Sequence, residues 1–386
     1  MVDFSLTDEQ TQWRNQVRKF TQEEIIPRTD LDIHGHFPKD LYQKAFEAGL
    51  ITAAIPKTYG GQGRSYFELI LAAEELGYGD LGVATSTMLG KLSTASLLNF
   101  GTEDQKTRWI VPMTKKLTFS SHCWTEPEGS SNLVGRPATT TAKPVPGGFL
   151  LNGAKSTISN ATVASVFTVF ARMNPGPDGL TCFVVPRDAK GVEVTNPYKK
   201  MGQRAADTGR IDFHDVFVPE ADMIGKPGQG TQIGMRAIRA SRVGVAAMGI
   251  GVSCRARDLA KVYGHSHFAG DGKALIQQQD FRFQIAEMEA EIEMLRALTW
   301  RACWEVENGP EAMKLSSSAK WAGGEIAVRI TNRASEMLGA MGYLESGLAE
   351  KLIRDAKVLT IYEGPGAVQK MLIADVACRL GAGLKK

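Results

Sequence analysis

Apolar and polar residues follow two different periods along the chain, and the changes of period divide it into three stretches. Residues 1–118 repeat apolar side chains every three to four positions, which predicts amphipathic helices. Residues 119–226 change to short β-branched and aromatic runs bounded by Gly, Pro and Asn, which favour strands. Residues 227–386 return to long helical patterns.

Local capping signals support the helical stretches. Thr7 followed by Gln10 matches a capping box ahead of "WRNQVRKFTQEEI", and Pro27 ends that segment. Further helices are predicted over 37–50, 65–76, 85–100 and 102–115. The segments "FRFQIAEMEAEIEMLRALTWRACWEVEN" and "SSSAKWAGGEIAVRITNRASEML" are long enough for a four-helix bundle.

The predicted fold class is therefore α+β with three domains. We expect an N-terminal helical domain over 1–118, a central antiparallel β domain over 119–226, and a C-terminal four-helix bundle over 227–386. With 386 residues and 43% hydrophobic content, the chain is long enough to bury a sizeable core in each.

Charge and composition exclude several classes of protein. Lys and Arg number 45 against 42 Asp and Glu, without long runs of like charge, so we expect no nucleic-acid partner and no membrane partner. No apolar run approaches the roughly 20 residues of a membrane span, and the polar start lacks a signal peptide, which together predict a cytoplasmic protein. The cysteines are five, far apart and never in a CxxC pair, which indicates buried thiols rather than disulfides or zinc.

Motifs that suggest other chemistry each lack an essential feature. "GFLLNGAKST" reads as a strand pair, whereas a phosphate loop leads from a strand into a helix, and "GIGVSC" lacks the third glycine of a dinucleotide fingerprint. The two His-x-His pairs, 34–36 and 265–267, have no carboxylate or cysteine at motif spacing, so we expect no metal site. No G-x-S-x-G elbow is present in the sequence.

Four further segments, taken in order, point to one family. They are "CWTEPEGSSN" near residue 123, "LNGAKSTISN" near 151, "MGQRAADTGRIDFHDVFVP" near 201 and "EKLIRDAKVLTIYEGPGAVQ" near 350. Their order and spacing, with the helix, strand, helix arrangement, resemble the acyl-CoA dehydrogenase family over almost the whole chain. The resemblance implies an FAD-dependent enzyme that performs α,β-dehydrogenation of an acyl thioester, with hydride transfer to flavin N5. It also implies a homotetramer reoxidised by an electron-transfer flavoprotein.

One acidic residue, Glu363, stands between two helical patterns and matches the family's catalytic base. An α-hydrogen beside a thioester is weakly acidic, so its removal needs a positioned base and donors for the developing enolate oxygen. Gly364 follows and would give the backbone close access to the thioester, and burial in an apolar cavity would raise the pKa of Glu363. From spacing alone, a helix-capping or surface glutamate is the alternative.

The resemblance also implies roles for other residues. It places Thr125 and Ser159 at the flavin edge, on predicted strands, and Gln279 and Gly339 in further segments that bind the cofactor. Ser131 matches a position that contacts CoA, and Gly364 and Arg242 are expected at the substrate. An arginine at position 242 could instead fix its helix, and the sequence leaves both readings open.

Several positions depart from the family pattern. Thr157 replaces the aromatic residue that usually covers the flavin ring, Glu336 and Ala340 replace a Gln and a Gly, and Pro365 replaces a Thr. The segment "HSHFAGDGKA" lacks the arginine that reaches a neighbouring subunit's FAD. Lys91, within an apolar helix pattern, is an unusual cation that meets a substrate carboxylate or reaches out to solvent.

Three functions therefore stay open from the sequence. The first is an FAD-dependent acyl-CoA or acyl-carrier-protein dehydrogenase with Glu363 as the base. The second is a non-redox proton transfer or elimination on an acyl thioester by the same fold. The third is a non-catalytic partner subunit of a heteromeric dehydrogenase, which the missing flavin contacts favour and Glu363 disfavours.

Overall fold

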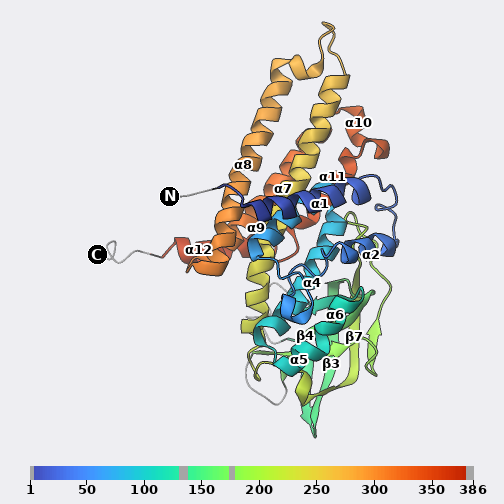
Figure 1. Cartoon of the computed structure of the whole chain (residues 1–386), viewed down its shortest axis with the longest axis vertical. Coiled ribbons are helices and arrows are strands. Elements are labelled where there is room, and N and C mark those ends of the chain that lie inside the picture. The colour runs from blue at the N-terminus through green and yellow to red at the C-terminus, as the bar shows by residue number, and fades with distance from the viewer. Residues whose placement is uncertain (1–3, 130–137, 174–178, 380–386) are drawn as a thin grey trace, which may run out of the picture.

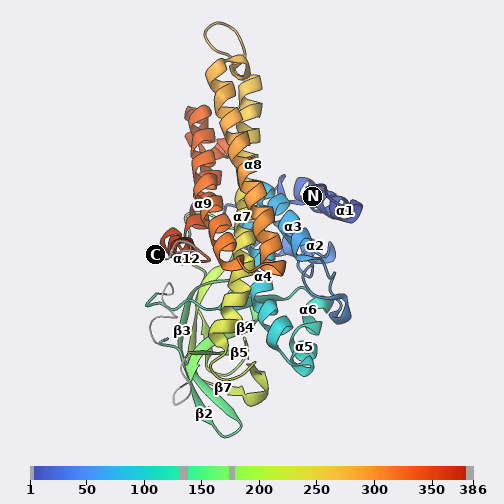
Figure 2. The same ribbon diagram turned by 90° about the vertical axis from the view of Figure 1, so that its left-hand side faces the viewer.

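The computed structural model describes residues 4–129, 138–173 and 179–379 of the chain. Long helices form one end of an elongated molecule and a twisted sheet forms the other, with the N-terminal helices packed beside both (Figures 1 and 2). This is the predicted α+β fold, with an N-terminal helical part, a central sheet and C-terminal helices.

The N-terminal part consists of helices that start at well-formed caps. They are α1 (Asp8–Phe20), α2 (Lys39–Glu47), α3 (Tyr66–Gly79), α4 (Leu81–Phe100), α5 (Glu103–Trp109) and α6 (Val111–Lys115), with the π-helical turn η1 (Thr21–Ile25) after α1 and the 3-10 turn η2 (Lys57–Tyr59) before α3. The predicted capping box of Thr7 and Gln10 is confirmed, because each side chain accepts a hydrogen bond from the other's backbone N–H. The single helix predicted over 102–115 is wrong: Pro112 lies in the first turn of α6, and the chain breaks at Ile110.

The sheet follows the order β6-β7-β3-β2-β4-β5-β8, with β1 paired to β4. Its strands are β1 (Phe119–Cys123), β2 (Thr141–Val145), β3 (Gly148–Ser159), β4 (Ala164–Met173), β5 (Leu180–Pro186), β6 (Val192–Val194), β7 (Thr208–Pro219) and β8 (Met223–Ile224). The pairs β2–β3, β3–β7, β4–β5, β5–β8 and β6–β7 are antiparallel as predicted. The pairs β1–β4 and β2–β4 are parallel, because longer connections bring those strands back in the same direction. The predicted strand pair at "GFLLNGAKST" is one continuous strand, β3.

The C-terminal part packs around one long helix. Its helices are α7 (Gly230–Ser266), α8 (Gln279–Asn308), α9 (Ala312–Met337), α10 (Ala340–Tyr343), α11 (Ala349–Lys357) and α12 (Gly366–Ala377), with 3-10 turns η4 (Leu275–Gln277), η5 (Glu345–Gly347) and η6 (Val358–Thr360), whereas the 3-10 turn η3 (Glu220–Asp222) precedes β8 in the sheet. A Cβ added at Gly249 of α7 would lie 2.7 Å from the carbonyl oxygen of Gly323 in α9, so the two helices cross with their backbones nearly touching. None of the helices in the described ranges has both the length and the apolar stretch that a bilayer span needs.

Candidate functional site

The turn that carries Glu363 is bent into an uncommon backbone conformation. Glu363 has φ +57° and Gly364 has φ +96°, both in the left-handed region, where a residue other than glycine is strained. The turn joins η6 to α12, so the carboxylate projects from between helices rather than from a helix face. Strained residues of this kind persist only where surrounding contacts hold them.

Three side chains from three helices provide those contacts. Arg242 of α7 donates its Nε–H to the carbonyl oxygen of Glu363 at 3.2 Å, and Gln369 of α12 donates to the same oxygen at 3.0 Å. Lys320 of α9 and Gln369 both donate to the carbonyl oxygen of Gly364, at 2.6 and 2.9 Å. A Cβ at Gly364 would lie 2.5 Å from Gln369 Nε2 and would have to displace that amide, and the φ of +96° makes any side chain at this position strained. The turn is therefore fixed through its backbone.

The Glu363 carboxylate is partly buried and faces two cations. Burial raises its pKa, and three influences oppose that rise: a 2.6 Å hydrogen bond from Ser241 Oγ to Oε2, and the charges of Arg242 and Lys320. Burial also lowers the pKa of Lys320 to about 8 and lowers that of Arg242. The net result for Glu363 is a pKa above the usual value, as a base working near neutral pH requires.

Helix α4 connects this turn to the sheet through two consecutive residues. Thr85 Oγ1 lies 3.5 Å from the hydroxyl of Tyr362, the neighbour of Glu363, and donates to Gln203 at 2.8 Å. Ser86 donates to the Asn160 side chain at 2.7 Å, next to Ser159 at the end of β3. Glu363 and Ser159, which are 204 positions apart by their residue numbers, are thus each one residue from a contact with the same turn of α4.

Thr125 and Ser159 lie in neighbouring segments at one end of the sheet. Ser159 is the last residue of β3, as predicted for a strand, whereas Thr125 lies two positions beyond β1, so the strand prediction for Thr125 is wrong. The backbone N–H of Ser156 donates to the Thr125 carbonyl at 2.9 Å, and Ser121 Oγ donates to the Ser159 carbonyl at 2.9 Å. Neither the Thr125 nor the Ser159 hydroxyl has a hydrogen-bond partner in the part of the chain that the structure describes.

A fully buried ion pair holds the segment around Thr125. Lys155 Nζ lies 3.0 Å from Glu126 Oε1 and donates to the Trp124 carbonyl at 3.1 Å, and both charged side chains have 0% exposure. Glu126 also accepts from the backbone N–H groups of Thr139 and Thr140 at 2.8 and 2.9 Å. Thr125 lies between two residues that Lys155 fixes, and this explains why its segment leaves the sheet.

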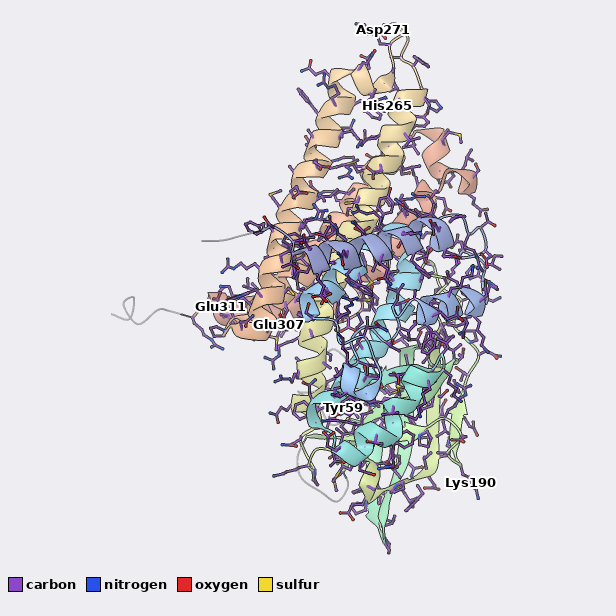
Figure 3. All side chains as sticks on the ribbon, viewed as in Figure 1. Tyr59, Lys190, His265, Asp271, Glu307 and Glu311 are labelled. Atoms are coloured by element: carbon purple, nitrogen blue, oxygen red, sulfur yellow. The ribbon has the colours of Figure 1, made fainter. Side chains whose placement is uncertain are left out.

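Two other predicted site residues, Gln279 and Gly339, do not lie near the Glu363 turn. Gln279 begins α8 and Gly339 precedes α10, at the far end of the helices from the sheet (Figure 1). Figure 3 marks that end with His265 and Asp271, opposite Lys190 in the sheet region. Their assignment to cofactor binding stays a prediction. Ser131 lies outside the described residues.

Sequence reasoning missed two of the side chains that hold the turn, Lys320 and Gln369. The available signal for Lys320 was a lysine within the apolar pattern "SSSAKWAGGEIAV", which is 1% exposed in the structure. Gln369 is fully buried six residues after Glu363, one helical turn into α12. A buried cation or amide is retained where it hydrogen-bonds, here to the turn.

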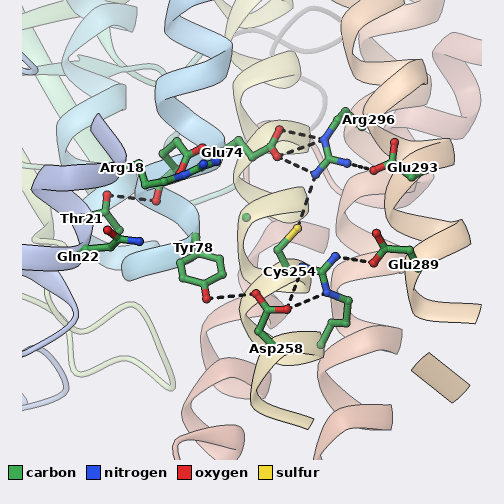
Figure 4. Close-up of a pocket in the computed structure, with 13 residues that line it drawn as sticks. Arg18, Thr21, Gln22, Glu74, Tyr78, Cys254, Asp258, Glu289, Glu293 and Arg296 are labelled. Atoms are coloured by element: carbon green, nitrogen blue, oxygen red, sulfur yellow. Dashed lines mark hydrogen bonds and ion pairs between the residues drawn. The ribbon is translucent and has the colours of Figure 1, made fainter. Parts of the chain in front are cut away.

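A separate cavity of about 440 Å³ lies between α1, α3, α7 and α8 (Figure 4). Arg296 is paired with Glu74 at 2.8 Å, and Arg257 with Glu289 at 2.5 Å and with Asp258 at 2.9 Å. The cavity contacts α7 over residues 251–258, which begin about 13 Å along the helix from Arg242. Its charges are satisfied by each other, so it is a structural ion-pair cluster rather than part of the Glu363 site.

Comparison with known proteins identifies the family of this chain. Three family models match consecutive parts of the chain: the acyl-CoA dehydrogenase N-terminal domain over residues 7–116, the middle domain over 121–216 and the C-terminal domain over 228–378. The chain belongs to the acyl-CoA dehydrogenase family.

Similar members of the acyl-CoA dehydrogenase family cover nearly its whole length. A probable acyl-CoA dehydrogenase, YngJ, of Bacillus subtilis is 32% identical over 381 residues, 97% of this chain and 99% of the relative. The mitochondrial short-chain specific acyl-CoA dehydrogenase of Rattus norvegicus is 32% identical over 366 residues, 94% of this chain and 88% of the relative. The structure of butyryl-CoA dehydrogenase from Megasphaera elsdenii superposes with a TM-score of 0.92 at 30% identity, covering 98% of this chain and 100% of that one.

This acyl-CoA dehydrogenase is therefore an oxidoreductase of CH–CH bonds that depends on FAD. The residues present fit a flavin. The hydroxyls of Thr125 and Ser159 have no hydrogen-bond partner in the described ranges, and the hydrogen bond from the Ser156 N–H to the Thr125 carbonyl holds their two segments together. Free hydroxyl donors of this kind are what the edge of a flavin ring requires. Thr157, where the family has an aromatic residue, is exposed, and its φ of +54° is strained for a β-branched side chain.

Proposed function

We propose that this protein catalyses α,β-dehydrogenation of an acyl thioester, with Glu363 as the base that removes the α-proton. One observation carries the proposal: a desolvated carboxylate stands on a strained turn whose backbone is held by Arg242, Lys320 and Gln369. A surface or capping glutamate needs no such support. FAD, when bound, supplies the two-electron acceptor that takes the β-hydrogen as hydride at N5.

The same turn offers donors for the charge that develops on the thioester oxygen. The backbone N–H groups of Glu363 and Gly364 have no hydrogen-bond partner among the described residues. An enolate oxygen placed against them would receive preorganised hydrogen bonds while the adjacent carboxylate takes the α-proton. Arg242 and Lys320 contribute positive charge to the same region. Base and oxyanion donors would thus come from two consecutive residues.

The substrate is inferred from similar proteins rather than from contacts in the structure. We infer an acyl-CoA or acyl-carrier-protein substrate, and the short-chain and butyryl specificities named for two relatives make butyryl-CoA the first compound to test. A homotetramer, reoxidation by an electron-transfer flavoprotein and a cytoplasmic location stay predictions. Substrate contacts by Arg242 and Ser131 are also predictions.

The test is rapid mixing of the oxidised Glu363→Gln variant with butyryl-CoA while flavin bleaching is followed. Glutamine keeps the volume of glutamate and removes the basic oxygen, so flavin content should persist and bleaching should slow by about 10²–10⁴-fold. Glu345→Gln, an exposed glutamate in the same part of the chain, is the matched control and should bleach at the wild-type rate.

Bleaching of Glu363→Gln at the wild-type rate would rule out Glu363 as the base. A wild-type protein that is yellow but bleaches with no acyl-CoA of any chain length would instead favour the non-redox reaction on a thioester. A purified protein without flavin, even after reconstitution with FAD, would favour the partner-subunit alternative.

A further inference from the structure

Ser241 has one hydroxyl proton and two acceptors within reach. It lies on α7 directly before Arg242, and its Oγ is 2.6 Å from Glu363 Oε2 and 3.0 Å from the carbonyl oxygen of Ile238, one helical turn earlier. A serine hydroxyl donates a single hydrogen bond and accepts two. The two contacts are therefore alternatives: the hydroxyl donates either to the Glu363 carboxylate or to the Ile238 carbonyl of its own helix.

The ionisation state of Glu363 determines which of these two acceptors the Ser241 hydroxyl prefers. An ionised carboxylate is the stronger acceptor, because hydrogen bonds to charged groups are shorter and about twice as strong as neutral ones. A protonated carboxyl group is a weaker acceptor, and the Ile238 carbonyl is then a competitive partner. The other carboxylate oxygen, Oε1, has no hydrogen-bond partner in the described part of the chain and is the oxygen left for a substrate proton.

We propose that Ser241 is a positioning residue that holds the ionised Glu363 by its Oε2 and lets the hydroxyl proton turn to the Ile238 carbonyl when Glu363 takes up the α-proton. No covalent bond of Ser241 breaks. The Cα–H bond of the substrate breaks, a new O–H bond forms on Glu363 Oε1, and the Ser241 hydroxyl only rotates. This inference rests on the proposed role of Glu363 as the base.

Such a donor has a measurable effect on the basicity of Glu363. Burial favours the neutral acid, and the Ser241 hydrogen bond opposes it by stabilising the charged form. A hydrogen bond to a charged group corresponds to about one to two pH units of pKa shift. Removing the hydroxyl should therefore raise the pKa of Glu363 further, and the fraction of base that is ionised should fall at neutral and acidic pH.

Other groups lie around Glu363 on several elements. Arg242 on α7 and Lys320 on α9 are the cations that act on its carboxylate. The phenol of Tyr362, which Thr85 on α4 contacts, has a pKa raised to about 12, and Gln369 on α12 is uncharged. Of these, Lys320 titrates closest to neutrality, because burial lowers its pKa to about 8. Only the acidic limb of a pH profile is therefore used to follow Glu363.

The experiment compares Ser241→Ala with wild type in the rate of flavin bleaching by butyryl-CoA from acidic to mildly alkaline pH. The acidic limb should move up by about one to two pH units, so that the rate falls about 10- to 100-fold on that limb and returns to within about threefold at the plateau. Ser241→Thr, which keeps a hydroxyl, should restore the wild-type profile. Ser253→Ala is the matched control, because Ser253 is a fully buried α7 serine that, among the described residues, donates only to the Gly249 carbonyl.

A second readout does not depend on turnover. Infrared difference spectra of the resting protein across pH report the protonated carboxyl group of Glu363, assigned by its loss in Glu363→Gln. The titration midpoint should rise by about one to two units in Ser241→Ala. If Ser241→Ala binds too little flavin for kinetics, Ser241→Cys, with its weaker donor, should show a smaller shift in the same direction.

Two results would overturn the inference while leaving the base in place. One is a profile and an infrared midpoint of Ser241→Ala that coincide with wild type, while Glu363→Gln is inactive. The other is a rate loss that is equal at every pH, since that would reflect packing rather than a tuned charge. An active Glu363→Gln variant would instead remove the proposed function itself.

Discussion

Replacement of Lys155 by Met should strongly destabilise the protein, because it leaves a buried carboxylate without its cation. Glu126 and Lys155 are both withdrawn from water, and Glu126 Oε2 also accepts from the hydroxyl of Thr139 at 2.9 Å. Burial alone would raise the pKa of Glu126, but Lys155 and the backbone N–H groups of Thr139 and Thr140 lower it to about 2. The native contacts thus favour the charged form despite the absence of solvent.

The magnitude follows from the pKa of Glu126 and from the behaviour of buried ion pairs. A shift from the usual 4.5 to about 2 corresponds to about 3 kcal/mol of stability. Breaking a buried pair by removing one partner costs about 3–5 kcal/mol, because the remaining charge is left uncompensated. We therefore expect Lys155→Met to lower the free energy of unfolding by about 3 kcal/mol at pH 7. The double variant Lys155→Met, Glu126→Gln should recover most of it.

The sign of the pH dependence provides a second check. A carboxyl group whose folded pKa is lowered contributes stability that is present above pH 4.5 and lost as the pH falls towards 2. Wild type should lose about 3 kcal/mol over this window. Lys155→Met should lose much less, because its Glu126 has already lost the cation that lowered its pKa. The deficit of the variant should therefore shrink in acid.

Urea unfolding at several pH values, followed by tryptophan fluorescence, measures both effects, and the flavin absorbance of the purified variants reports the cofactor segment. Lys143→Met, an exposed lysine of the neighbouring strand β2, is the control and should change stability by less than about 0.5 kcal/mol. Flavin content should fall with Lys155→Met, because Lys155 fixes the residues on both sides of Thr125. The reasoning fails if Lys155→Met is as stable as Lys143→Met, or if the double variant is no more stable than the single one.

Two further variants test other parts of the structure. Lys91→Met should raise the midpoint of thermal unfolding by several degrees at pH 7, with no gain above about pH 10. Burial lowers the pKa of Lys91 to about 7, so at pH 7 the unfolded chain binds this proton more strongly than the folded protein does. A midpoint equal to that of the exposed Lys115→Met control would contradict this. Gly364→Ala should slow flavin bleaching at least tenfold, since its Cβ meets Gln369 at 2.5 Å, whereas Gly366→Ala has room at 3.7 Å and should be neutral; equal rates in the two would contradict it.

Local signals in the sequence predicted local structure well. The capping box at Thr7 uses groups three residues apart, so the printed sequence contains everything that determines it. The split of the helix predicted over 102–115 depended on Pro112, whose missing N–H is also a local signal. The parallel pairing of β1 with β4 has no such signal, because alternation of apolar residues is the same for either direction of a neighbouring strand.

The candidate site was predictable only in part, for the same reason. Glu363 was identified through its motif, but the contacts that give it a function come from residues distant in the chain: Ser241 is 122 positions away and Lys320 is 44 away from its partner Gly364. Thr125 was assigned to a strand because its neighbours are β-formers, and the tie from Lys155 to Trp124, 31 positions apart, overrides that preference. Long-range hydrogen bonds of this kind follow from the fold and not from spacing.

The arrangement of cations around Glu363 explains why its pKa stays raised with two positive side chains so near. Arg242 and Lys320 direct their N–H groups at the backbone carbonyls of Glu363 and Gly364, and neither forms an ion pair within 4.0 Å of the carboxylate in the described structure. Their charges therefore reach the carboxylate without a direct hydrogen bond, and burial remains the largest influence on it. A direct bidentate pair with arginine would fix the carboxylate as an anion and consume its basic oxygens. By holding the turn through its carbonyls, the two cations support the strained backbone and leave Oε1 free to accept a proton.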